Sequence, residues 1–425
     1  MVLSEVYKRK YTFGEDYGTS DYKFGPITLG ERPEVIENRG YFPDTSSIMF
    51  KLMGVKKDVI VGKDLAVHLG SREELTSHLV YPMRKGVVDR GDEKAWKVIY
   101  EITRYGLDFF RQSDPDFKGF YVCAALSAIA PRYMYEKIFE IHRKIDEETK
   151  LIKAVTIIPQ PLAVAIAHKV PTCIVIESGH GNTQVCPISR YPVKGAMVVL
   201  NRGGSDADAL TSQILYDAGY SDIAKEEALV RRIKEALGLV PRKLDEAVEV
   251  AKQKPELFRA KYRVPGTRIE VDLGKESWAR FLIGEYVFNP KHEIFKSYFK
   301  RGMPKPKDVK VGEILFRGML DLGESVIESV EKCPIELQPY LYGKVLLSGG
   351  NFHWRAPPQF REVAVDSATK LKLLLAEKGV ENVTVEVAPE PKFSVWRGCI
   401  IYGYAVPEDY TWSWDNMEGW LRIHD

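Results

Sequence analysis

The stretch that decides the fold reads YTFGEDYGTS at residues 11–20, and it returns in a similar form as CIVIESGHGNT at residues 173–183. Each copy has a run typical of a β-strand, an acidic residue, a glycine-containing turn with hydroxyl side chains, and a second strand-like run. The acidic residues are Asp16 and Glu177. A duplicated strand–turn–strand unit predicts two similar α/β halves with a ligand held between them.

The segments around these two units alternate between helical and strand patterns. Apolar residues recur every three or four positions in residues 92–110 and 131–148, which predicts helices, and residues 120–128 read as a buried strand. Further helices are expected at 225–240 and 241–260, with Pro241 in the first turn of the second one. Strand-and-turn units are expected at 344–354 and 391–405. This alternation predicts a layered α/β protein.

Length and composition exclude several classes of protein. The chain has 425 residues, 45% of them hydrophobic and 28% charged, which is typical of a folded protein with more than one domain. Lys and Arg (61) nearly balance Asp and Glu (59), so no chain-wide field favours nucleic acid as a ligand. Apolar windows are too short for a membrane span and no signal-peptide pattern begins the sequence, so we expect a cytoplasmic protein.

The cysteines are scattered and odd in number. Most lie in apolar, strand-like sequence, which favours buried thiols over a disulfide framework or a zinc site. They are Cys123, Cys173, Cys186, Cys333 and Cys399.

The two glycine turns have the chemistry of a phosphate site. A glycine lets the backbone approach a phosphate, and successive N–H groups in such a turn bind anions. The hydroxyls of Thr19, Ser20 and Ser178 would add donors. Phosphate charge calls for a divalent cation, which Asp16 and Glu177 could hold as Mg²⁺ through bound waters. Each turn alone is compatible with an ordinary hairpin, whereas two equivalent turns favour the phosphate site.

Gln160 stands between Pro159 and Pro161, directly before an apolar helical segment in which Pro161 is expected at the first position. An amide fixed in this way can orient an attacking water without acting as a strong base. The alternative is that Gln160 only caps the helix.

With these motifs in place, the chain resembles the actin family, and within it most closely the archaeal actins. FGEDYGTSDYK resembles the first phosphate loop, IIPQPLAVAIA the first interdomain connection and IESGHGNTQVCPI the second phosphate loop. VGKDLA (61–66) and YPMRKGVV (81–88) resemble the end of the small outer subdomain. The three segments that surround adenosine are matched by VRRIKEAL (230–237), LSGGNFHW (347–354) and PKFSVWRG (391–398).

The resemblance implies an actin-like ATPase fold. Two similar α/β halves would enclose a nucleotide cleft, each half with a large and a small subdomain. The implied ranges are 1–37, 82–167 and 393–425 for subdomain 1, 38–81 for subdomain 2, 168–202 and 305–392 for subdomain 3, and 203–304 for subdomain 4.

The resemblance also implies roles for individual residues. Asp16 and Glu177 would hold hydrated Mg²⁺, and Gln160 would position the lytic water. Lys234 and Glu235 would contact ribose and base, and their spacing from Arg231 on one helix end would let the three converge, although a solvated charged face has the same pattern. The implied nucleotide contacts are Gly18, Thr19, Ser20, Lys23, Ser178, Gly179, His180, Gly181, Asn182, Gly204, Arg231, Lys234, Glu235, Gly349, Gly350, Asn351, His353, Trp354 and Lys392.

The sequence departs from conventional actins at several of these positions. Glu177 and His180 each stand where those actins have an aspartate, and Gln184 replaces a histidine near the γ-phosphate. His353 and Trp354 replace Met and Tyr at the adenine wall. Nucleotide binding is still expected, and the departures bear on the hydrolysis rate and on base selectivity.

Three further regions are expected to make contacts. Residues 46–62 correspond to the outer loop that binds the next subunit in actins, with a local core as the alternative; its apolar residues are Met49, Phe50, Leu52, Met53 and Val55. Residues 288–310 carry eight Lys, Arg or His residues together with Phe295, Tyr298 and Phe299. Filament contact is favoured there over nucleic-acid binding. The tail, with Trp412, Trp414 and Trp420, is expected to pack on the first half, with partner docking as the alternative.

These expectations combine into a filament subunit that binds Mg-ATP, polymerises with itself and hydrolyses ATP to ADP on assembly, with actin-associated proteins as possible partners. A non-polymerising actin-related adaptor and a small-molecule kinase of the same fold are the alternatives. A chaperone ATPase would need a separate substrate-binding domain, which is not expected because little sequence follows residue 405.

Overall fold

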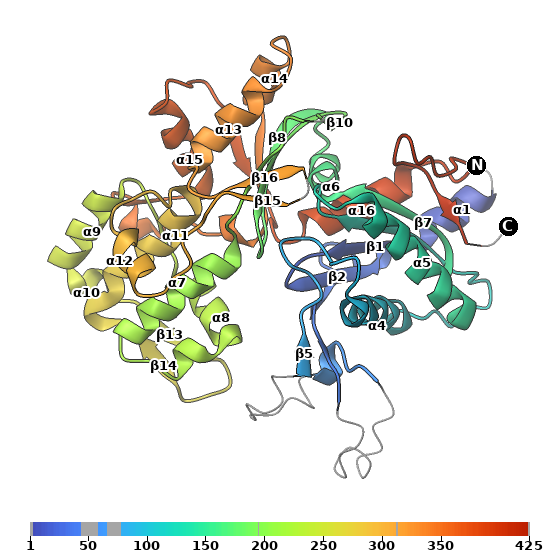
Figure 1. The fold of residues 1–425 in the computed structure, drawn as a ribbon, viewed down its shortest axis with the longest axis horizontal. Helices are drawn as coiled ribbons and strands as arrows, with labels where there is room; N and C mark the ends of the chain where they lie inside the picture. Colours follow the sequence, from blue (N-terminus) through green and yellow to red (C-terminus); the bar gives the residue numbers. More distant parts are fainter. Residues whose placement is uncertain (1–2, 44–57, 66–77, 194, 312, 424–425) are drawn as a thin grey trace. The chain divides into compact units, whose positions relative to one another are not determined.

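The computed structural model describes residues 3–43, 58–65, 78–193, 195–311 and 313–423. The chain divides into two compact units (Figure 1). The first unit comprises Met1–Lys169 and Phe393–Asp425, and the second comprises Val170–Lys392. Each unit is built around its own β-sheet, so the predicted α/β class is confirmed. The division into four subdomains stays a prediction.

The first unit contains a mixed sheet in which β1 lies between the parallel strand β6 and the antiparallel strand β2. Every residue of β6 is buried, because helices cover both faces of the sheet. In sheet order the strands are β20 (Leu421–Arg422), β7 (Ile152–Pro159), β6 (Phe120–Leu126), β1 (Thr12–Tyr17), β2 (Asp21–Pro26) and β3 (Glu34–Glu37). The unit also contains α1 (Leu3–Lys10), β4 (Gly40–Tyr41) and β5 (Leu79–Val80).

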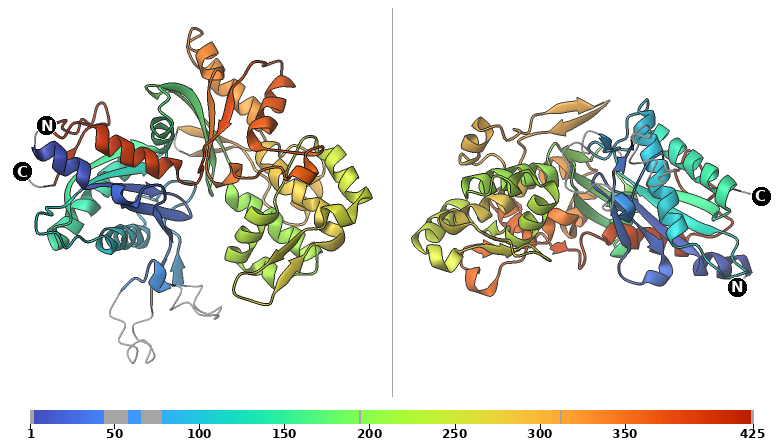
Figure 2. Two further views of the ribbon diagram at one scale, coloured as in Figure 1. Left: turned by 180° about the vertical axis from the view of Figure 1, so that it is seen from behind. Right: turned by 90° about the horizontal axis from the view of Figure 1, so that it is seen from below.

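Two pairs of helices cover the two faces of this sheet. The predicted helices α4 (Glu93–Phe109) and α5 (Arg132–Thr149) are confirmed, and Asp92 caps α4 by accepting a hydrogen bond from the Ala95 N–H. They lie on the face to which Glu15 and Tyr17 point. The opposite face, to which Gly14 and Asp16 point, is covered by α6 (Gln160–Ala167) and α16 (Ser394–Ala405). The left view of Figure 2, seen from behind, shows the red helix α16 lying along this sheet.

The prediction of a strand at residues 391–405 is wrong, because the structure has helix α16 there. Trp396 and Cys399 are among its buried residues, and apolar residues occupy nearly all its sides, so the sequence carries no helical periodicity. Glycine allows α16 to approach α6 closely: a Cβ at Gly398 would lie 1.9 Å from the Ala163 carbonyl oxygen.

The second unit contains the other large sheet, centred on the antiparallel hairpin of β8 and β9, with β17 parallel to β8. Its strands in order are β15 (Val309–Val311), β16 (Ile314–Arg317), β11 (Val198–Leu200), β9 (Thr183–Ser189), β8 (Thr172–Ser178), β17 (Val345–Ser348) and β19 (Val385–Val387), with β10 (Tyr191–Pro192) paired to β9. The larger helices are α7 (Gly204–Asp217), α8 (Glu227–Leu237), α9 (Leu244–Gln253), α11 (Arg280–Phe288), α13 (Leu322–Glu331) and α15 (Ser367–Ala376). The shorter elements are α10 (Pro255–Phe258), α12 (Phe295–Lys300), α14 (Gln338–Tyr342), β12 (Val240–Pro241), β13 (Lys261–Arg263), β14 (Glu270–Asp272) and β18 (Ala364–Val365).

The helix predicted for residues 241–260 begins later than expected. Pro241 belongs to β12 and pairs with Ala364 of β18, so α9 begins at Leu244 instead. A proline at the first helical position and a proline in a short edge strand look alike in sequence, because neither position requires a backbone N–H.

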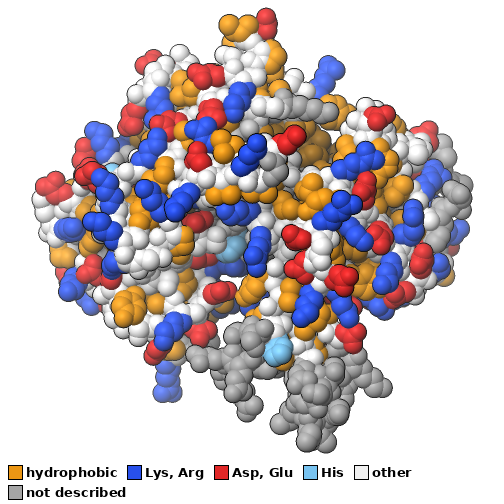
Figure 3. Space-filling view, in the orientation of Figure 1, with side chains coloured by type: hydrophobic (Ala, Val, Ile, Leu, Met, Phe, Trp, Pro, Cys, Tyr) orange, Lys and Arg blue, Asp and Glu red, His pale blue; other side chains and the backbone are white. Residues whose placement is uncertain are grey.

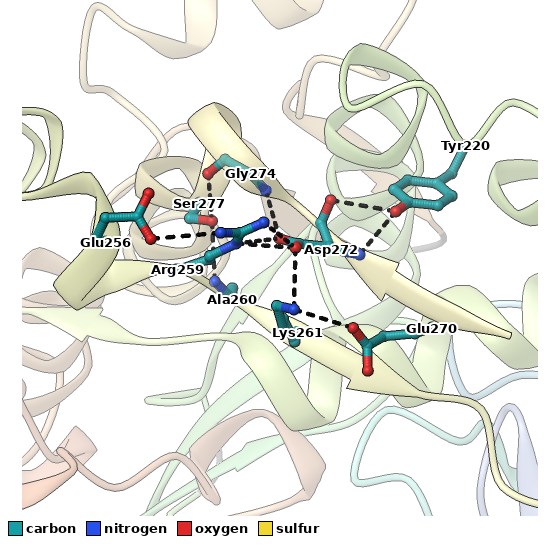
Figure 4. A network of polar contacts seen from close by, with 9 residues as sticks. All are labelled: Tyr220, Glu256, Arg259, Ala260, Lys261, Glu270, Asp272, Gly274 and Ser277. Carbon is teal, nitrogen blue, oxygen red and sulfur yellow. Dashed lines mark hydrogen bonds and ion pairs between the residues drawn. The ribbon is translucent and has the colours of Figure 1, made fainter.

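A polar network braces the β13–β14 hairpin of the second unit (Figure 4). Asp272 accepts hydrogen bonds from Arg259 Nε at 2.9 Å and from the Gly274 N–H at 2.9 Å. Its own N–H donates to the Tyr220 hydroxyl at 2.8 Å. Hydrogen bonding to Arg259 is the main cause that lowers the pKa of Asp272 to about 2. The hairpin is therefore fixed at the end away from its turn.

The expectations for cysteines and for the tail are confirmed. All five thiols are free and buried. Trp412 and Trp420 are buried in the first unit, where β20 pairs with β7.

The two candidate assembly regions have different outcomes. Met49, Phe50, Leu52, Met53 and Val55 lie outside the described residues. In the second region Phe295 and Tyr298 are buried in the core, so their rings are not available to stack on bases. Lys291 pairs with Glu324 and Arg301 with Asp217. The structure therefore does not favour nucleic acid there, and filament contact stays a prediction.

The surface carries interspersed charges of both signs on the face shown in Figure 3. No helix within the described ranges combines the length and the apolar character that a membrane crossing requires.

Candidate functional site

The first turn carries a buried ion pair. Asp16 on β1 and Lys23 on β2 are direct cross-strand partners, and Lys23 Nζ lies 2.6 Å from Asp16 Oδ2. The Asp16 side chain is 2% exposed. The close ion pair compensates the burial of both charges and fixes the carboxylate at the end of β1.

Hydrogen bonds within the turn and from two other segments of the first unit fix the turn itself. The Gly18 N–H donates to the Asp21 carbonyl at 3.0 Å, and a Cβ at Gly18 would lie 2.8 Å from that oxygen. Asn38 donates its side-chain amide to the Gly18 carbonyl at 2.7 Å. The hydroxyl of Thr19 accepts from the Gly86 N–H at 2.9 Å. Asn38 and Gly86 were not predicted, because they are distant in sequence and carry no motif.

Gln160 is the first residue of α6, so Pro161 occupies the second position and not the expected first one. The Gln160 amide nitrogen donates to Asp16 Oδ1 at 2.8 Å and to the Tyr17 carbonyl at 3.2 Å. Its side chain is buried, and no side-chain hydrogen bond caps α6. The helix-cap alternative is therefore wrong, and Gln160 instead joins Asp16 in one buried cluster.

The second turn, residues 179–182, is tightly bonded within the second unit. The Gly179 N–H donates to the Asn182 carbonyl at 3.1 Å, and the hydroxyls of Ser178 and Thr183 lie 2.7 Å apart. Asn351 donates its amide to Ser178 Oγ at 3.0 Å and to the Gly179 carbonyl at 2.9 Å. Asn351 was expected to contact nucleotide, and its side chain here holds the turn.

The start of α7 is joined to this turn. The N–H groups of Gly204 and Ser205 donate to the carbonyls of Gly179 and His180, both at 2.9 Å. A Cβ at Gly203 would lie 2.6 Å from the His180 oxygen, so the approach requires glycine. The turn and the first turn of α7 therefore form one rigid structure.

A charged cluster connects the turn with α8. Lys234 Nζ lies 2.8 Å from Asp208 Oδ1 and donates to the Gly204 carbonyl at 3.2 Å. His180 Nδ1 lies 3.7 Å from Asp208 Oδ2. Asp208 was not predicted from the sequence. The available signal was its position four residues after Gly204, which places both on one face of α7.

The segment after β17 completes the cluster. Gly349 has a φ of 96°, and a Cβ there would lie 2.1 Å from the Ser178 carbonyl oxygen, so glycine is required. At Gly350 φ is not positive and an added Cβ would meet no described atom within 4 Å. His353 contacts the Gly350 carbonyl through Nδ1 at 2.5 Å and the Glu235 carbonyl through Nε2 at 2.9 Å. Trp354 donates to the Lys234 carbonyl at 3.3 Å.

The predicted site residues thus fall into two groups, one in each unit. The first group joins Asp16, Gly18, Thr19, Lys23 and Gln160, with Ser20 in the same turn. The second group is connected through backbone or side chains and comprises Ser178, Gly179, His180, Asn182, Gly204, Lys234, Glu235, Gly349, Gly350, Asn351, His353 and Trp354. None of the contacts above involves Glu177 on β8, Gly181, Arg231 or Lys392, although Lys392 directly follows Pro391, whose carbonyl accepts from the Gly349 N–H at 2.9 Å.

The carboxylates of Asp16 and Glu177 have the hard oxygen atoms that Mg²⁺ prefers. Both oxygens of Asp16 already have protein partners, so its donor set fits a cation held through water better than a direct ligand. The Glu177 carboxylate oxygens each lie 3.6 Å from the position of a Cβ at Gly179, so glycine leaves room beside them. No group of three or more His, Cys, Asp or Glu residues in the described part of the chain is arranged to hold an ion.

The family model described as Actin matches residues 47–406. The matched range includes Gln160, the second turn and the residues of α8 that contact it. The first turn precedes this range.

Proposed function

The chain belongs to the actin family, and on that basis we propose that it binds Mg-ATP, assembles into homopolymeric filaments and hydrolyses ATP to ADP on assembly. The observation that carries this proposal is the pair of internally bonded glycine turns, each with a lysine–carboxylate pair close to it: Lys23 with Asp16 beside the first turn, and Lys234 with Asp208 where α8 meets the start of α7. The closer similarity to archaeal actins, the crenactins, and a place in the cytoplasm belong to the same proposal.

The phosphates would bind to the two turns. Lys23 would supply a positive charge, and donors would come from hydroxyl and N–H groups of residues 18–20 and 178–182 other than the N–H groups of Gly18 and Gly179, which already bond within the turns. Bound Mg²⁺ would neutralise phosphate charge, and Asp16 and Glu177 would hold its water shell. Adenosine would contact α8 through Arg231, Lys234 and Glu235, and the segment from Gly349 to Trp354, with Lys392 beside it.

Gln160 has the contacts of a water-orienting residue. Its amide nitrogen donates both hydrogens, to Asp16 and to the Tyr17 carbonyl, so the amide plane is fixed and the carbonyl Oε1 remains the group that can accept a hydrogen bond from water. An amide held in this way orients a nucleophile without changing charge. We propose that Gln160 orients the water that attacks the γ-phosphate.

The test is sedimentation and negative-stain electron microscopy of the purified protein with Mg-ATP, with Mg-ADP and without nucleotide, alongside a phosphate-release assay. Filaments that form with Mg-ATP, and phosphate release that follows assembly, are the expected result. Nucleotide binding without any polymer would favour the non-polymerising adaptor, and absence of nucleotide binding would overturn the proposal.

A further inference from the structure

Asp208 lies on α7 one turn after its start, between two basic side chains. Lys234 approaches one carboxylate oxygen from α8, at 2.8 Å from Oδ1, and His180 faces the other from the second turn, at 3.7 Å from Oδ2. The side chain of Lys234 is 6% exposed and that of Asp208 is 17% exposed. The acid is therefore held in place and still reaches the surface of the site.

The two oxygens of this carboxylate have different surroundings. Oδ1 is buried and lies next to the ammonium group of Lys234. Oδ2 receives no hydrogen bond from any described residue, since the separation of 3.7 Å from His180 Nδ1 exceeds hydrogen-bond distance. A carboxylate oxygen can accept two hydrogen bonds, so Oδ2 is an ordered acceptor with unused capacity.

The charge of Asp208 decides which part of a nucleotide can approach Oδ2. A carboxylate repels phosphate, so its partner must be a donor, and the hydroxyl groups of ribose are donors close to the phosphates. We propose that Asp208 accepts a hydrogen bond from a ribose hydroxyl and thereby makes the site selective for ribonucleotides over deoxyribonucleotides. This inference rests on the proposed function, because it needs Mg-ATP to bind at the second turn.

The arrangement of Lys234 supports the same conclusion. Its ammonium is fixed by Asp208 and by the Gly204 carbonyl, so the carboxylate is oriented before any ligand arrives. An acceptor oriented in advance loses little conformational freedom when it binds a hydroxyl. A hydrogen bond to a charged acceptor corresponds to a preference of about tenfold or more for ATP over an analogue that lacks the contacted hydroxyl.

The test measures dissociation constants of the full chain for Mg-ATP, Mg-2′-deoxyATP and Mg-3′-deoxyATP by calorimetry. The variants are Asp208→Ala, which removes the acceptor, and Asp208→Asn, which keeps the shape and removes the charge. Asp217→Asn is the matched control, because Asp217 lies at the far end of α7 and pairs with Arg301. Since loss of Asp208 also leaves Lys234 uncompensated, the readout is the ratio between nucleotides and not the absolute affinity.

We expect the wild type and Asp217→Asn to prefer ATP over at least one deoxy analogue by about tenfold or more, and Asp208→Ala to bind all three about equally. Asp208→Asn is expected to lose at least part of the preference and serves if the alanine variant fails to fold. A wild type that binds ATP without discrimination, or Asp208 variants that keep the wild-type ratio, would overturn this inference and leave the proposed function intact. A wild type that binds none of the three would overturn both.

Discussion

Glu15 and His142 form an ion pair that is fully buried in the first unit, with Nε2 of the histidine 2.9 Å from Oε2 of the glutamate and both side chains 0% exposed. The hydroxyls of Tyr17 and Tyr22 donate to the same carboxylate, and His142 Nδ1 contacts the Ile138 carbonyl at 2.8 Å. Glu15 adjoins Asp16 on β1 and points to the opposite face of the sheet. The buried network therefore fixes β1, the strand that carries Asp16, from the face of the sheet opposite to Asp16.

This network predicts a pH-dependent contribution to stability. Burial alone would lower the pKa of His142, but attraction to Glu15 and the hydrogen bonds to Glu15 and Ile138 raise it overall. A raised pKa in the folded state means that the contribution is complete below the unfolded value of about 6.5 and is lost as pH rises through the folded value. His142→Gln should therefore lower the free energy of unfolding more at pH 6 than at pH 9, by about 3 kcal/mol at the lower pH. Urea unfolding at both pH values measures this. The control is His292→Gln, because His292 forms a partly exposed pair with Asp245. An equal loss at both pH values in His142→Gln would contradict the prediction.

Gln160→Ala is expected to slow phosphate release by about tenfold or more, which corresponds to about 1.4 kcal/mol on the barrier, while ATP affinity changes little because no charge is removed. Filaments should form and persist longer. A phosphate-release time course measured beside light scattering on one sample tests both effects. Gln253→Ala removes an exposed amide as the control. Unchanged release in Gln160→Ala would show that the contact with Asp16 has no catalytic consequence.

Asp16→Asn should weaken Mg-ATP binding and hydrolysis together. The amide keeps the shape, but it cannot neutralise Lys23 or attract a hydrated cation. We expect ATP affinity at fixed free Mg²⁺ to fall by about tenfold or more, and the Mg²⁺ concentration needed for half-maximal binding to rise. Calorimetric titrations of ATP at several Mg²⁺ concentrations give both quantities. Wild-type values for both would remove Asp16 from the site.

Neighbouring glycines should respond differently to the same substitution. Gly349→Ala places a Cβ against the Ser178 backbone at a positive φ, so it should lower stability by about 2 kcal/mol or more. Gly350→Ala meets no described atom and no strained backbone, so it should leave the melting temperature unchanged and weaken ATP binding, since the added methyl would occupy space next to the ligand. Thermal unfolding and calorimetry of both variants test the pair of expectations. A Gly350→Ala variant with wild-type ATP affinity would show that the nucleotide does not approach this backbone.

Local sequence patterns were sufficient for the elements whose formation depends on neighbouring residues. The β1–β2 and β8–β9 hairpins follow from strand runs separated by glycine turns, and α4 and α5 follow from their periodic apolar faces. The pattern failed for α16, because a helix with apolar residues on nearly all its sides has no polar face to reveal its period. The long-range partners of the site were equally invisible. Asn38 and Asp208 reach the turns only through tertiary structure: spacing places Asp208 on the same face of its helix as Gly204, but the sequence does not show that the fold brings Lys234 beside it.

The return of residues 393–423 to the first unit has a consequence for biosynthesis. Helix α16 covers one face of the first sheet and β20 extends its edge, although both are translated after the whole second unit. On a ribosome, the second unit is continuous and has all its strands once residue 392 has emerged. The first unit begins earlier but must wait, with the α16-facing side of β1 uncovered, until the last part of the chain is released. The unit that is synthesised first is therefore the one that matures last.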